Sequence, residues 1–359
     1  HGMTEHMGRY EALALYLQPM GIAVAGFDLR GHGKNPGDAE VASFGEGGWT
    51  ASIEDMRLFY ALLEQRFAGA PHYMLGFSLG SFLLREYLTK YPDESEIAGA
   101  IIMGTGHQPG WLLSIMMSIV KGQIKKAGFD KTTDLVRQLS FGTYNQKFKP
   151  NRTAADWLCS DETELDKYLA DPLVRKDISS GLFWELLGSM KRTGSAFEYD
   201  GWDTSLPILL ISGQDDPVGD GGKGVQAIYS RMKKAGMENV TLKLFPSARH
   251  DLLHEDENGG EAARKLIAVL LASLMLYYAY EANVSYTAMY YHNRNMENYY
   301  AALTTQVRMT EGFTSDKNWA FIGNNQDPLR FSFWSDSTRY GGNANTEGLI
   351  NAYSKHAWM

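Results

Sequence analysis

Residues 73–80 are Tyr73-Met74-Leu75-Gly76-Phe77-Ser78-Leu79-Gly80, an apolar run that ends in the pattern Gly-x-Ser-x-Gly. The apolar residues before Ser78 are typical of a buried strand, and residues 81–91 after it have helical spacing. A serine at such a strand-to-helix turn is held in a strained backbone conformation that lifts its hydroxyl out of the sheet. We therefore predict that Ser78 is a nucleophile and that the Leu79 amide, at the helix start, is an oxyanion donor.

A serine hydroxyl is a weak nucleophile at neutral pH, and it needs a base that is itself oriented by a carboxylate. Two later predicted strands lead to candidates for both groups. One runs into a loop with the adjacent acids Asp215 and Asp216, either of which can lie at the carboxyl end of the strand, and we favour Asp216. The next strand leads to His250. The order Ser78, Asp216, His250 resembles the order found in α/β hydrolases.

A zinc site is the alternative interpretation of His250. His250 and His254 are four residues apart, which is the spacing of a zinc-binding helix. Pro246 and the predicted strand before it place this segment on a loop, and no third ligand is evident downstream. We therefore predict no metal site and a structural role for His254. Residues 219–224 lack the spacing of a phosphate-binding loop, so no cofactor is expected.

The composition excludes several classes of protein. The chain has 359 residues, 44% of them hydrophobic, so it can fill a large globular core. Its 42 acidic and 34 basic residues give a net charge of -8, and no basic run is interleaved with aromatic residues, so nucleic acid is not expected as a partner. Cys159 is the only cysteine, which rules out an intrachain disulfide and favours an inert, packed thiol.

The sequence predicts neither a secretory leader nor a membrane span. The chain opens on His1-Gly2-Met3, without a basic or apolar leader segment. Residues 266–280 are uncharged, but a helix of that length spans only about 22 Å of a hydrocarbon core of ~30 Å. We therefore expect a cytoplasmic protein that can contact a membrane surface through residues 266–280 or through an apolar lid.

Short apolar strands alternate with helical patterns in the first part of the chain, which is typical of βαβ units and a parallel sheet. Before residue 106 we predict strands over 21–27, 73–77 and 97–103 and a helix over 49–67. Helices rich in Met, Trp and Leu follow, and the alternation then resumes with strands over 207–212 and 240–245 and helices over 222–234 and 261–274. The predicted division is a core over 1–105, a helical lid over 106–201, the second part of the core over 202–274 and an extension of uncertain fold over 275–359.

The lid contains one strongly apolar segment, made of Trp111, Leu112, Leu113, Ile115, Met116, Met117, Ile119 and Val120. Flexible Met and Leu side chains suit an acyl chain, because they adapt to apolar shapes. The same segment is equally expected of a helix packed in the lid's own core, because exposed and buried apolar patches are alike in sequence.

The first residues are His1-Gly2-Met3-Thr4-Glu5-His6, a loop that can bring a second backbone amide to a substrate carbonyl oxygen. We assign that amide to Met3. This loop resembles a motif of the monoacylglycerol lipase and lysophospholipase group of α/β hydrolases. The resemblance continues in the same order to about residue 274, through DLRGHG at 28–33, GFSLG at 76–80, GQDDPVG at 213–219 and ARHDLLHE at 248–255. The lid segments 156–160 and 168–173 resemble the bacterial members.

The resemblance implies the α/β-hydrolase fold, with a mostly parallel sheet, helices on both faces and a helical lid. It also implies that Asp216 is the acid, since this residue immediately precedes Pro217 and Val218. The implied function is a carboxylic ester hydrolase that acts on a small lipid or ester, of monoacylglycerol or lysophospholipid type, through a Ser-His-Asp acyl-enzyme mechanism. The alternatives are an aminopeptidase or amidase on the same triad, and an inactive fragment or a membrane-associated binding protein.

Two features depart from that group. Its members carry two or three strands before the His-Gly motif that this sequence lacks, so we expect either a fragment or another element beside the Ser78 strand. The extension over 275–359 lies beyond the last helix of the group, and residues 299–303, 312–313 and 319–323 resemble the end of bacterial membrane glucosyltransferases. That likeness predicts a chain joined from two unrelated proteins; the alternative is a substrate-binding or partner-binding module.

Overall fold

The computed structural model describes residues 1–35, 37, 40–92, 97–195, 198–255, 259–272, 283–287, 289–290 and 294–295. The chain divides into two units, His1–Met275 and Leu276–Met359. In the second unit the described residues are helical, and the rest of the predicted extension lies outside the described residues. The first unit holds every predicted site residue.

A four-stranded parallel sheet forms the centre of the first unit, in the order β2-β3-β5-β6. Its strands are β2 (Tyr73–Phe77), β3 (Gly99–Met103), β5 (Ile208–Gly213) and β6 (Val240–Phe245). Gly76 lies opposite Ile102, and Ile102 lies opposite Leu210. Both β3 and β5 are buried along their whole length, as expected for strands covered on both faces. The four strands predicted from apolar runs at these places are confirmed.

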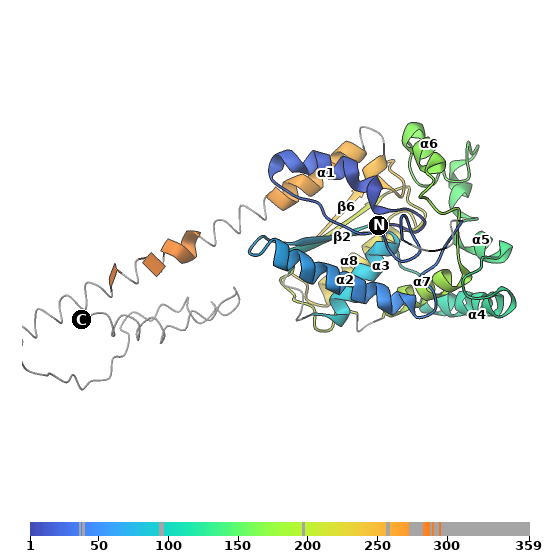
Figure 1. Cartoon of the computed structure of the whole chain (residues 1–359), viewed down its shortest axis with the longest axis horizontal. Helices are drawn as coiled ribbons and strands as arrows, with labels where there is room; N and C mark the ends of the chain where they lie inside the picture. The colour runs from blue at the N-terminus through green and yellow to red at the C-terminus, as the bar shows by residue number, and fades with distance from the viewer. Residues whose placement is uncertain are drawn as a thin grey trace, which may run out of the picture. The chain divides into compact units, whose positions relative to one another are not determined.

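Helices cover both faces of this sheet (Figure 1). One face carries α2 (Gly48–Arg66), α3 (Leu79–Lys90) and α8 (Lys223–Lys234); the other carries α1 (Glu11–Leu17) and the helical residues 260–272. Ile102 and Leu210 pack in the core under α2, α3 and α8, whereas Ile101 and Leu209 pack in the core under α1. This alternation follows from the two-residue repeat of a strand, and it makes the sheet the wall between two cores.

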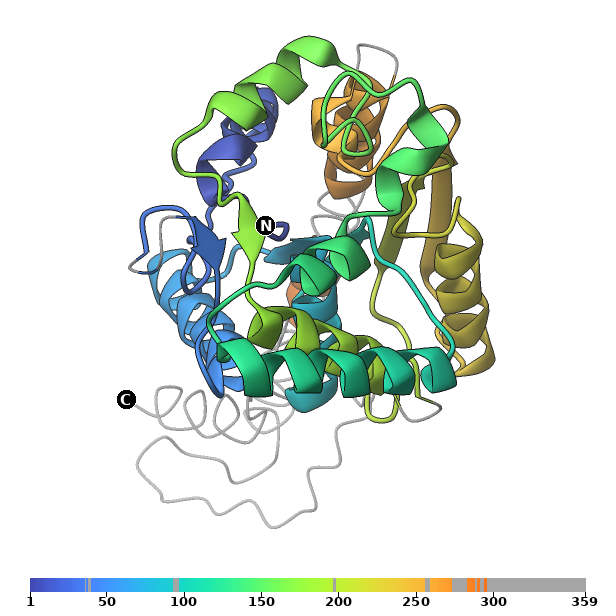
Figure 2. The ribbon, with the colours of Figure 1, turned by 90° about the vertical axis from the view of Figure 1, so that its right-hand side faces the viewer.

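The region between β3 and β5 is mainly helical. Its elements are α4 (Gly110–Ala127), α5 (Asp134–Ser140), η3 (Tyr144–Phe148), α6 (Glu162–Ala170), β4 (Asp177–Ile178) and α7 (Ser180–Arg192). Figure 2 shows α4 and α7 lying side by side. The short β4 pairs in parallel with β1 (Val41–Ala42). The remaining short helices are η1 (Met7–Tyr10), η2 (Gln18–Met20) and η4 (Leu252–His254). The predicted boundaries of the lid, at 106 and 201, stay a prediction.

The apolar lid segment lies on α4 and divides between two environments. Leu113 and Val120 are fully buried in the core that also holds α7. Trp111, Ile115 and Ile119 are 68%, 52% and 40% exposed. The helix therefore packs in a core on one side and presents an apolar stripe on the other. Contact of that stripe with an acyl chain stays a prediction.

The predicted buried strand over residues 21–27 is wrong. The structure gives residues 22–29 no regular secondary structure, and Val24 is 36% exposed. An apolar run becomes a strand only where a neighbour pairs with its backbone groups. Among the described residues no strand pairs with 22–29, and β2 has a strand neighbour on its β3 side alone.

No helix in the described part of the chain combines the length and the apolar composition that crossing a bilayer requires.

The central position of Ile102 predicts a large loss of stability when its side chain is shortened. Ile102 is 0% exposed, so Ile102→Ala leaves a cavity in the core under α3. We expect the free energy of unfolding to fall by about 2–5 kcal/mol in urea titrations followed by circular dichroism. The exposed residue of the same type, Ile115, is the control, and Ile115→Ala should change that free energy by less than about 0.5 kcal/mol. Equal effects of the two substitutions would contradict this account of the core.

Candidate active site

Ser78 lies at the turn between β2 and α3 in a strained backbone conformation. Its φ is 49° and its ψ is -113°, a region that residues with a side chain rarely adopt. The Ser78 amide donates a hydrogen bond to the Met103 carbonyl at the end of β3, at 2.9 Å. The sheet therefore holds this turn at the carboxyl edge of its strands, where side chains from several loops meet.

Two glycines permit this turn because their backbones approach other backbone atoms closely. A Cβ on Gly76 would lie 2.5 Å from the Gly80 carbonyl oxygen, and a Cβ on Gly80 would lie 2.9 Å from the His1 carbonyl oxygen. Neither backbone oxygen can move aside cheaply. The Gly-x-Ser-x-Gly pattern is thus a steric requirement of this turn.

The structure brings Ser78, Asp216 and His250 together. His250 Nε2 is 2.8 Å from Ser78 Oγ, and His250 Nδ1 is 2.9 Å from Asp216 Oδ1. A carboxylate can only accept, so Nδ1 carries a proton and Nε2 is free to accept the hydroxyl proton of Ser78. Asp216 is 0% exposed and also accepts hydrogen bonds from Ser212 Oγ, at 3.1 Å, and from the Val218 amide, at 2.8 Å.

The neighbouring acid, Asp215, points elsewhere. Its Oδ1 forms an ion pair with Lys147 Nζ at 2.5 Å, and both side chains are exposed. Of the two candidates that the sequence offered, only Asp216 contacts His250.

The His-Gly loop lies against the start of α3. The Gly80 amide donates to the His1 carbonyl at 3.2 Å, and the Leu29 amide donates to His1 Nε2 at 2.9 Å. Leu79 is the first residue of α3, where backbone amides lack an acceptor within the helix. The oxyanion roles of Met3 and Leu79 stay predictions, and this placement of the loop is compatible with them.

A buried charge cluster joins the His-Gly loop to the His250 loop. Arg9 donates to Glu5 Oε2 at 2.9 Å and to Asp251 Oδ2 at 2.8 Å, and Glu5 Oε1 accepts from the Gly2 amide at 2.6 Å. His254 contacts Asp251 Oδ1 through Nδ1 at 2.9 Å and the Arg9 carbonyl through Nε2 at 3.0 Å. Sequence reasoning predicted a structural role for His254 but missed the other three residues. An acid and an arginine four residues apart, at Glu5 and Arg9, were the signal available.

Burial and charge oppose each other in this cluster. Burial lowers the pKa of His254, but the charge and the hydrogen bond of Asp251 outweigh it, so the pKa of His254 is raised. Burial raises the pKa of Asp251, but His254 and Arg9 outweigh it, so the pKa of Asp251 is lowered. Both shifts favour an ion pair of His254 and Asp251.

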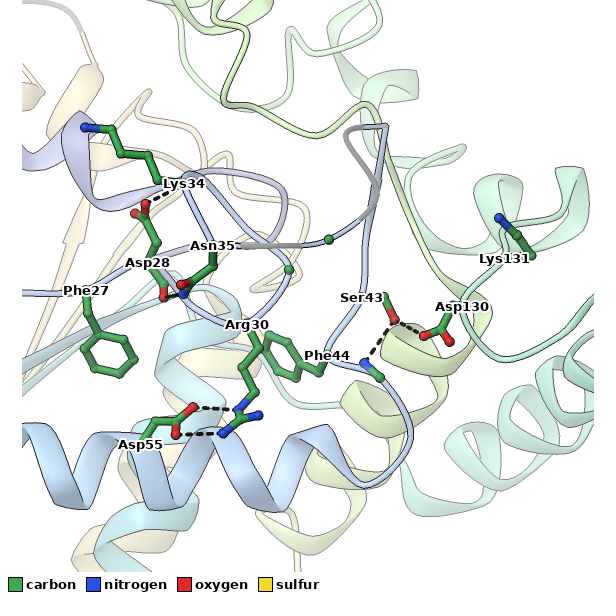
Figure 3. Close-up of a pocket in the computed structure, with 13 residues that line it drawn as sticks. Phe27, Asp28, Arg30, Lys34, Asn35, Ser43, Phe44, Asp55, Asp130 and Lys131 are labelled. Carbon is green, nitrogen blue, oxygen red and sulfur yellow. Dashed lines mark hydrogen bonds and ion pairs between the residues drawn. The ribbon is translucent and has the colours of Figure 1, made fainter.

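A cavity of about 850 Å³ lies in a different place (Figure 3). It is lined by Phe27, Asp28, Arg30, Gly31, Lys34, Asn35, Gly37, Ser43, Phe44, Gly45, Asp55, Asp130 and Lys131. Arg30 makes two hydrogen bonds to Asp55, at 2.6 and 2.8 Å, and Ser43 donates to Asp130 at 2.6 Å. None of Ser78, Asp216 and His250 lines this cavity, so its size alone does not make it the reactive site.

No group of three or more His, Cys, Asp or Glu residues within the described ranges is placed to hold a metal ion.

Comparison with known proteins agrees with this geometry. The family described as serine aminopeptidase, S33, matches residues 1–257. The chain belongs to this family of α/β hydrolases. The predicted membership of the α/β hydrolases is thereby confirmed.

Individual relatives have low sequence identity to this chain, which is a member of the serine aminopeptidase family. Human monoglyceride lipase is 27% identical over 258 residues, which cover 71% of this chain and 75% of the lipase. An abhydrolase domain-containing protein of Dictyostelium discoideum is 28% identical over 261 residues, but the chain spans only 24% of its length. A carboxyl esterase from Bacillus coagulans superposes with a TM-score of 0.66 at 22% identity, over 76% of this chain and 88% of the esterase. This structural likeness confirms the predicted fold.

The raised pKa of His254 predicts a pH dependence of stability. A group whose pKa is raised on folding contributes stability that is present below its unfolded pKa, about 6.5, and is lost as pH rises through the folded value. We expect the free energy of unfolding to fall between about pH 6 and about pH 9 by more in the wild type than in His254→Gln. Urea titrations at the two pH values measure both slopes. Parallel slopes would show that His254 makes no charged contact with Asp251.

Proposed function

We propose that this serine hydrolase cleaves the carboxylic ester of a single-acyl lipid, of monoacylglycerol or lysophospholipid type. The observation that carries the proposal is the hydrogen-bonded series Ser78, His250, Asp216, in which His250 and Asp216 are buried. The similarity to human monoglyceride lipase supports the substrate class. The structure of the turn supports the nucleophile, because strain is retained where it positions a reacting group.

In the proposed mechanism, Ser78 Oγ attacks the ester carbonyl carbon while His250 Nε2 takes its proton. Asp216 holds the imidazole in the required tautomer and stabilises the imidazolium. The Leu79 and Met3 amides hold the oxyanion. When the intermediate collapses, the ester C–O bond breaks and the alcohol leaves with the proton from His250. Water then attacks the acyl-enzyme by the same route, which releases the fatty acid and regenerates Ser78.

The lid supplies apolar surface for this proposal. The exposed stripe of α4, formed by Trp111, Ile115 and Ile119, is available to an acyl chain or to a membrane surface that delivers the substrate. The other predicted contact segment, residues 266–280, is described only to residue 272. In that part Ile267 and Leu271 are buried against the sheet, whereas Val269 is 55% exposed, so contact of this segment with a membrane stays a prediction.

The family description favours a second candidate, an aminopeptidase on the same triad. Ester and amide substrates require the same nucleophile, base and oxyanion donors, so the triad does not separate the two. The surfaces that bind the leaving group therefore decide between ester and amide substrates.

Substrate profiling of wild type and Ser78→Ala tests the proposed function. We expect release of fatty acid from a monoacylglycerol and no release from aminoacyl anilides, with kcat/KM at least about 10⁴-fold lower in Ser78→Ala. A fluorophosphonate probe should label the wild type and leave Ser78→Ala unlabelled. Anilide cleavage without ester cleavage would replace the lipase proposal with the peptidase. Equal labelling of the two proteins, or none of either, would refute the catalytic role of Ser78.

The adjacent acids provide a matched pair of variants. Asp216→Asn removes the carboxylate that orients His250, so kcat should fall by about 10⁴-fold, as a wrong tautomer predicts. Asp215→Asn removes only the surface ion pair with Lys147, and its kcat should stay within about 3-fold of wild type. Steady-state hydrolysis of a soluble nitrophenyl ester measures both. A larger loss of kcat in Asp215→Asn than in Asp216→Asn would show that Asp216 is not the acid of the triad.

A further inference from the structure

Two aromatic rings pack on the imidazole of His250. The ring centroid of Phe77 is 4.9 Å from that of His250, with 41° between the planes. The ring centroid of Trp157 is 5.2 Å away, with 35° between the planes. His250 is 1% exposed and Trp157 is 7% exposed, so these contacts are made away from water. Phe77 belongs to the strand before the nucleophile, whereas Trp157 comes from the region predicted to be the lid.

The hydrogen bonds of His250 leave its orientation incompletely fixed. Ser78 and Asp216 hold the two nitrogens along the edge of the ring. These two hydrogen bonds leave the imidazole free to tilt about the axis through its nitrogens. Packing against the faces of the ring resists this tilting. Trp157 and Phe77 supply such packing. Gly104 leaves no room for a side chain beside the imidazole, since a Cβ there would lie 3.0 Å from His250 Cε1.

Trp157 is itself held firmly. Its amide donates to Asn145 Oδ1 at 2.8 Å, and its ring packs on those of Tyr144, at 4.9 Å, and Phe141, at 5.9 Å. Its carbonyl accepts from the His250 amide at 3.4 Å. The Trp157 ring is thus held by Tyr144 and Phe141 as well as by the His250 loop.

Further hydrogen bonds connect residues 156–160 to the loop that carries His250. The Asp251 amide donates to the Leu158 carbonyl at 2.7 Å, and Arg249 Nη1 donates to the Cys159 carbonyl at 3.1 Å. Glu255 Oε2 accepts from the Ser160 amide at 2.9 Å. With these contacts the two segments must move together, so displacement of residues 156–160 would displace His250.

We propose that Trp157 is a positioning residue for His250, which makes residues 156–160 a part of the proton-transfer machinery rather than only a cover over the substrate. The inference rests on the proposed function of Ser78 and His250. The Trp157 ring keeps Nε2 aligned with Ser78 Oγ. It also presents an aromatic face to the imidazolium that forms during each turnover, an attraction that is strongest where water is excluded. The ring therefore acts on turnover more than on substrate binding.

Three variants separate positioning from general packing. Trp157→Met removes the aromatic ring but keeps bulk and flexibility, and kcat should fall about 10- to 100-fold while KM stays within about 2-fold. Trp157→Phe keeps an aromatic face and should retain kcat within about 5-fold of wild type. Trp202→Met is the control, because Trp202 is equally buried, at 6% exposed, and packs on Tyr199 instead of His250. It should lose stability but keep kcat.

A spectroscopic readout is independent of turnover. The Trp157 ring current shifts the NMR resonance of the His250 Cε1 proton, which His250→Gln identifies by its disappearance. Trp157→Met should move this resonance, whereas Trp202→Met should leave it in place. Trp157→Phe disturbs the packing least and tests the inference even where Trp157→Met does not fold. In this variant the His250 resonance should move in the same direction by a smaller amount.

The outcomes for the two proposals differ. A wild-type protein that neither hydrolyses esters nor reacts with the fluorophosphonate refutes the proposed function. An active wild type in which Trp157→Met and Trp202→Met have the same kcat, or in which the loss appears in KM alone, overturns the positioning role. An unmoved His250 resonance in Trp157→Met overturns the ring contact itself.

Discussion

The strained turn at Ser78 is the constraint on which the rest of the site depends. A serine with φ at 49° is unstable in an isolated chain, so the surrounding structure must hold it. The Met103 carbonyl accepts from the Ser78 amide, the close approach of Gly76 and Gly80 to other backbone atoms leaves no room for side chains there, and the His1 carbonyl accepts from the Gly80 amide. Each of these contacts comes from a different segment. Ser78 is therefore positioned by the parallel sheet as a whole, so its proposed role as nucleophile depends on the folded structure.

Buried ion pairs fix the segments around this turn. On one side, Arg9 and Asp251 join the His-Gly loop to the His250 loop. On the other side, Arg85 of α3 pairs with Glu198 at 2.6 Å, with both side chains 1% exposed, and also donates to the Thr193 carbonyl. Such pairs add little net stability compared with apolar residues, but loss of one partner leaves a buried charge without compensation. These pairs therefore fix where the segments lie relative to one another. Such fixing suits a site that must align three side chains from three loops.

The lid region serves two requirements at once in this account. The exposed stripe of α4 offers apolar surface, as a lipid substrate requires, whereas residues 156–160 are hydrogen-bonded to the loop of the general base. Relatives that share the triad can differ in substrate because the triad chemistry is common to esters and amides. A lid that also positions His250 can change substrate preference only within the limits that this contact sets. Trp157 thereby links the predicted lid to the triad through its contact with His250.

The sequence by itself determined the four strands of the central sheet and the family, and it predicted Ser78 as nucleophile and His250 as base, because apolar runs, glycine spacing and the order Ser78, Asp216, His250 are local patterns. It left Asp215 and Asp216 as neighbours on one loop, and only the tertiary structure showed which of them contacts His250. The predicted strand over 21–27 failed because strand formation needs a pairing neighbour, which an apolar run does not specify. The Arg9–Asp251 pair and the contact of Trp157 with His250 join residues far apart in the chain, and such contacts are decided by how the loops meet at the edge of the folded sheet.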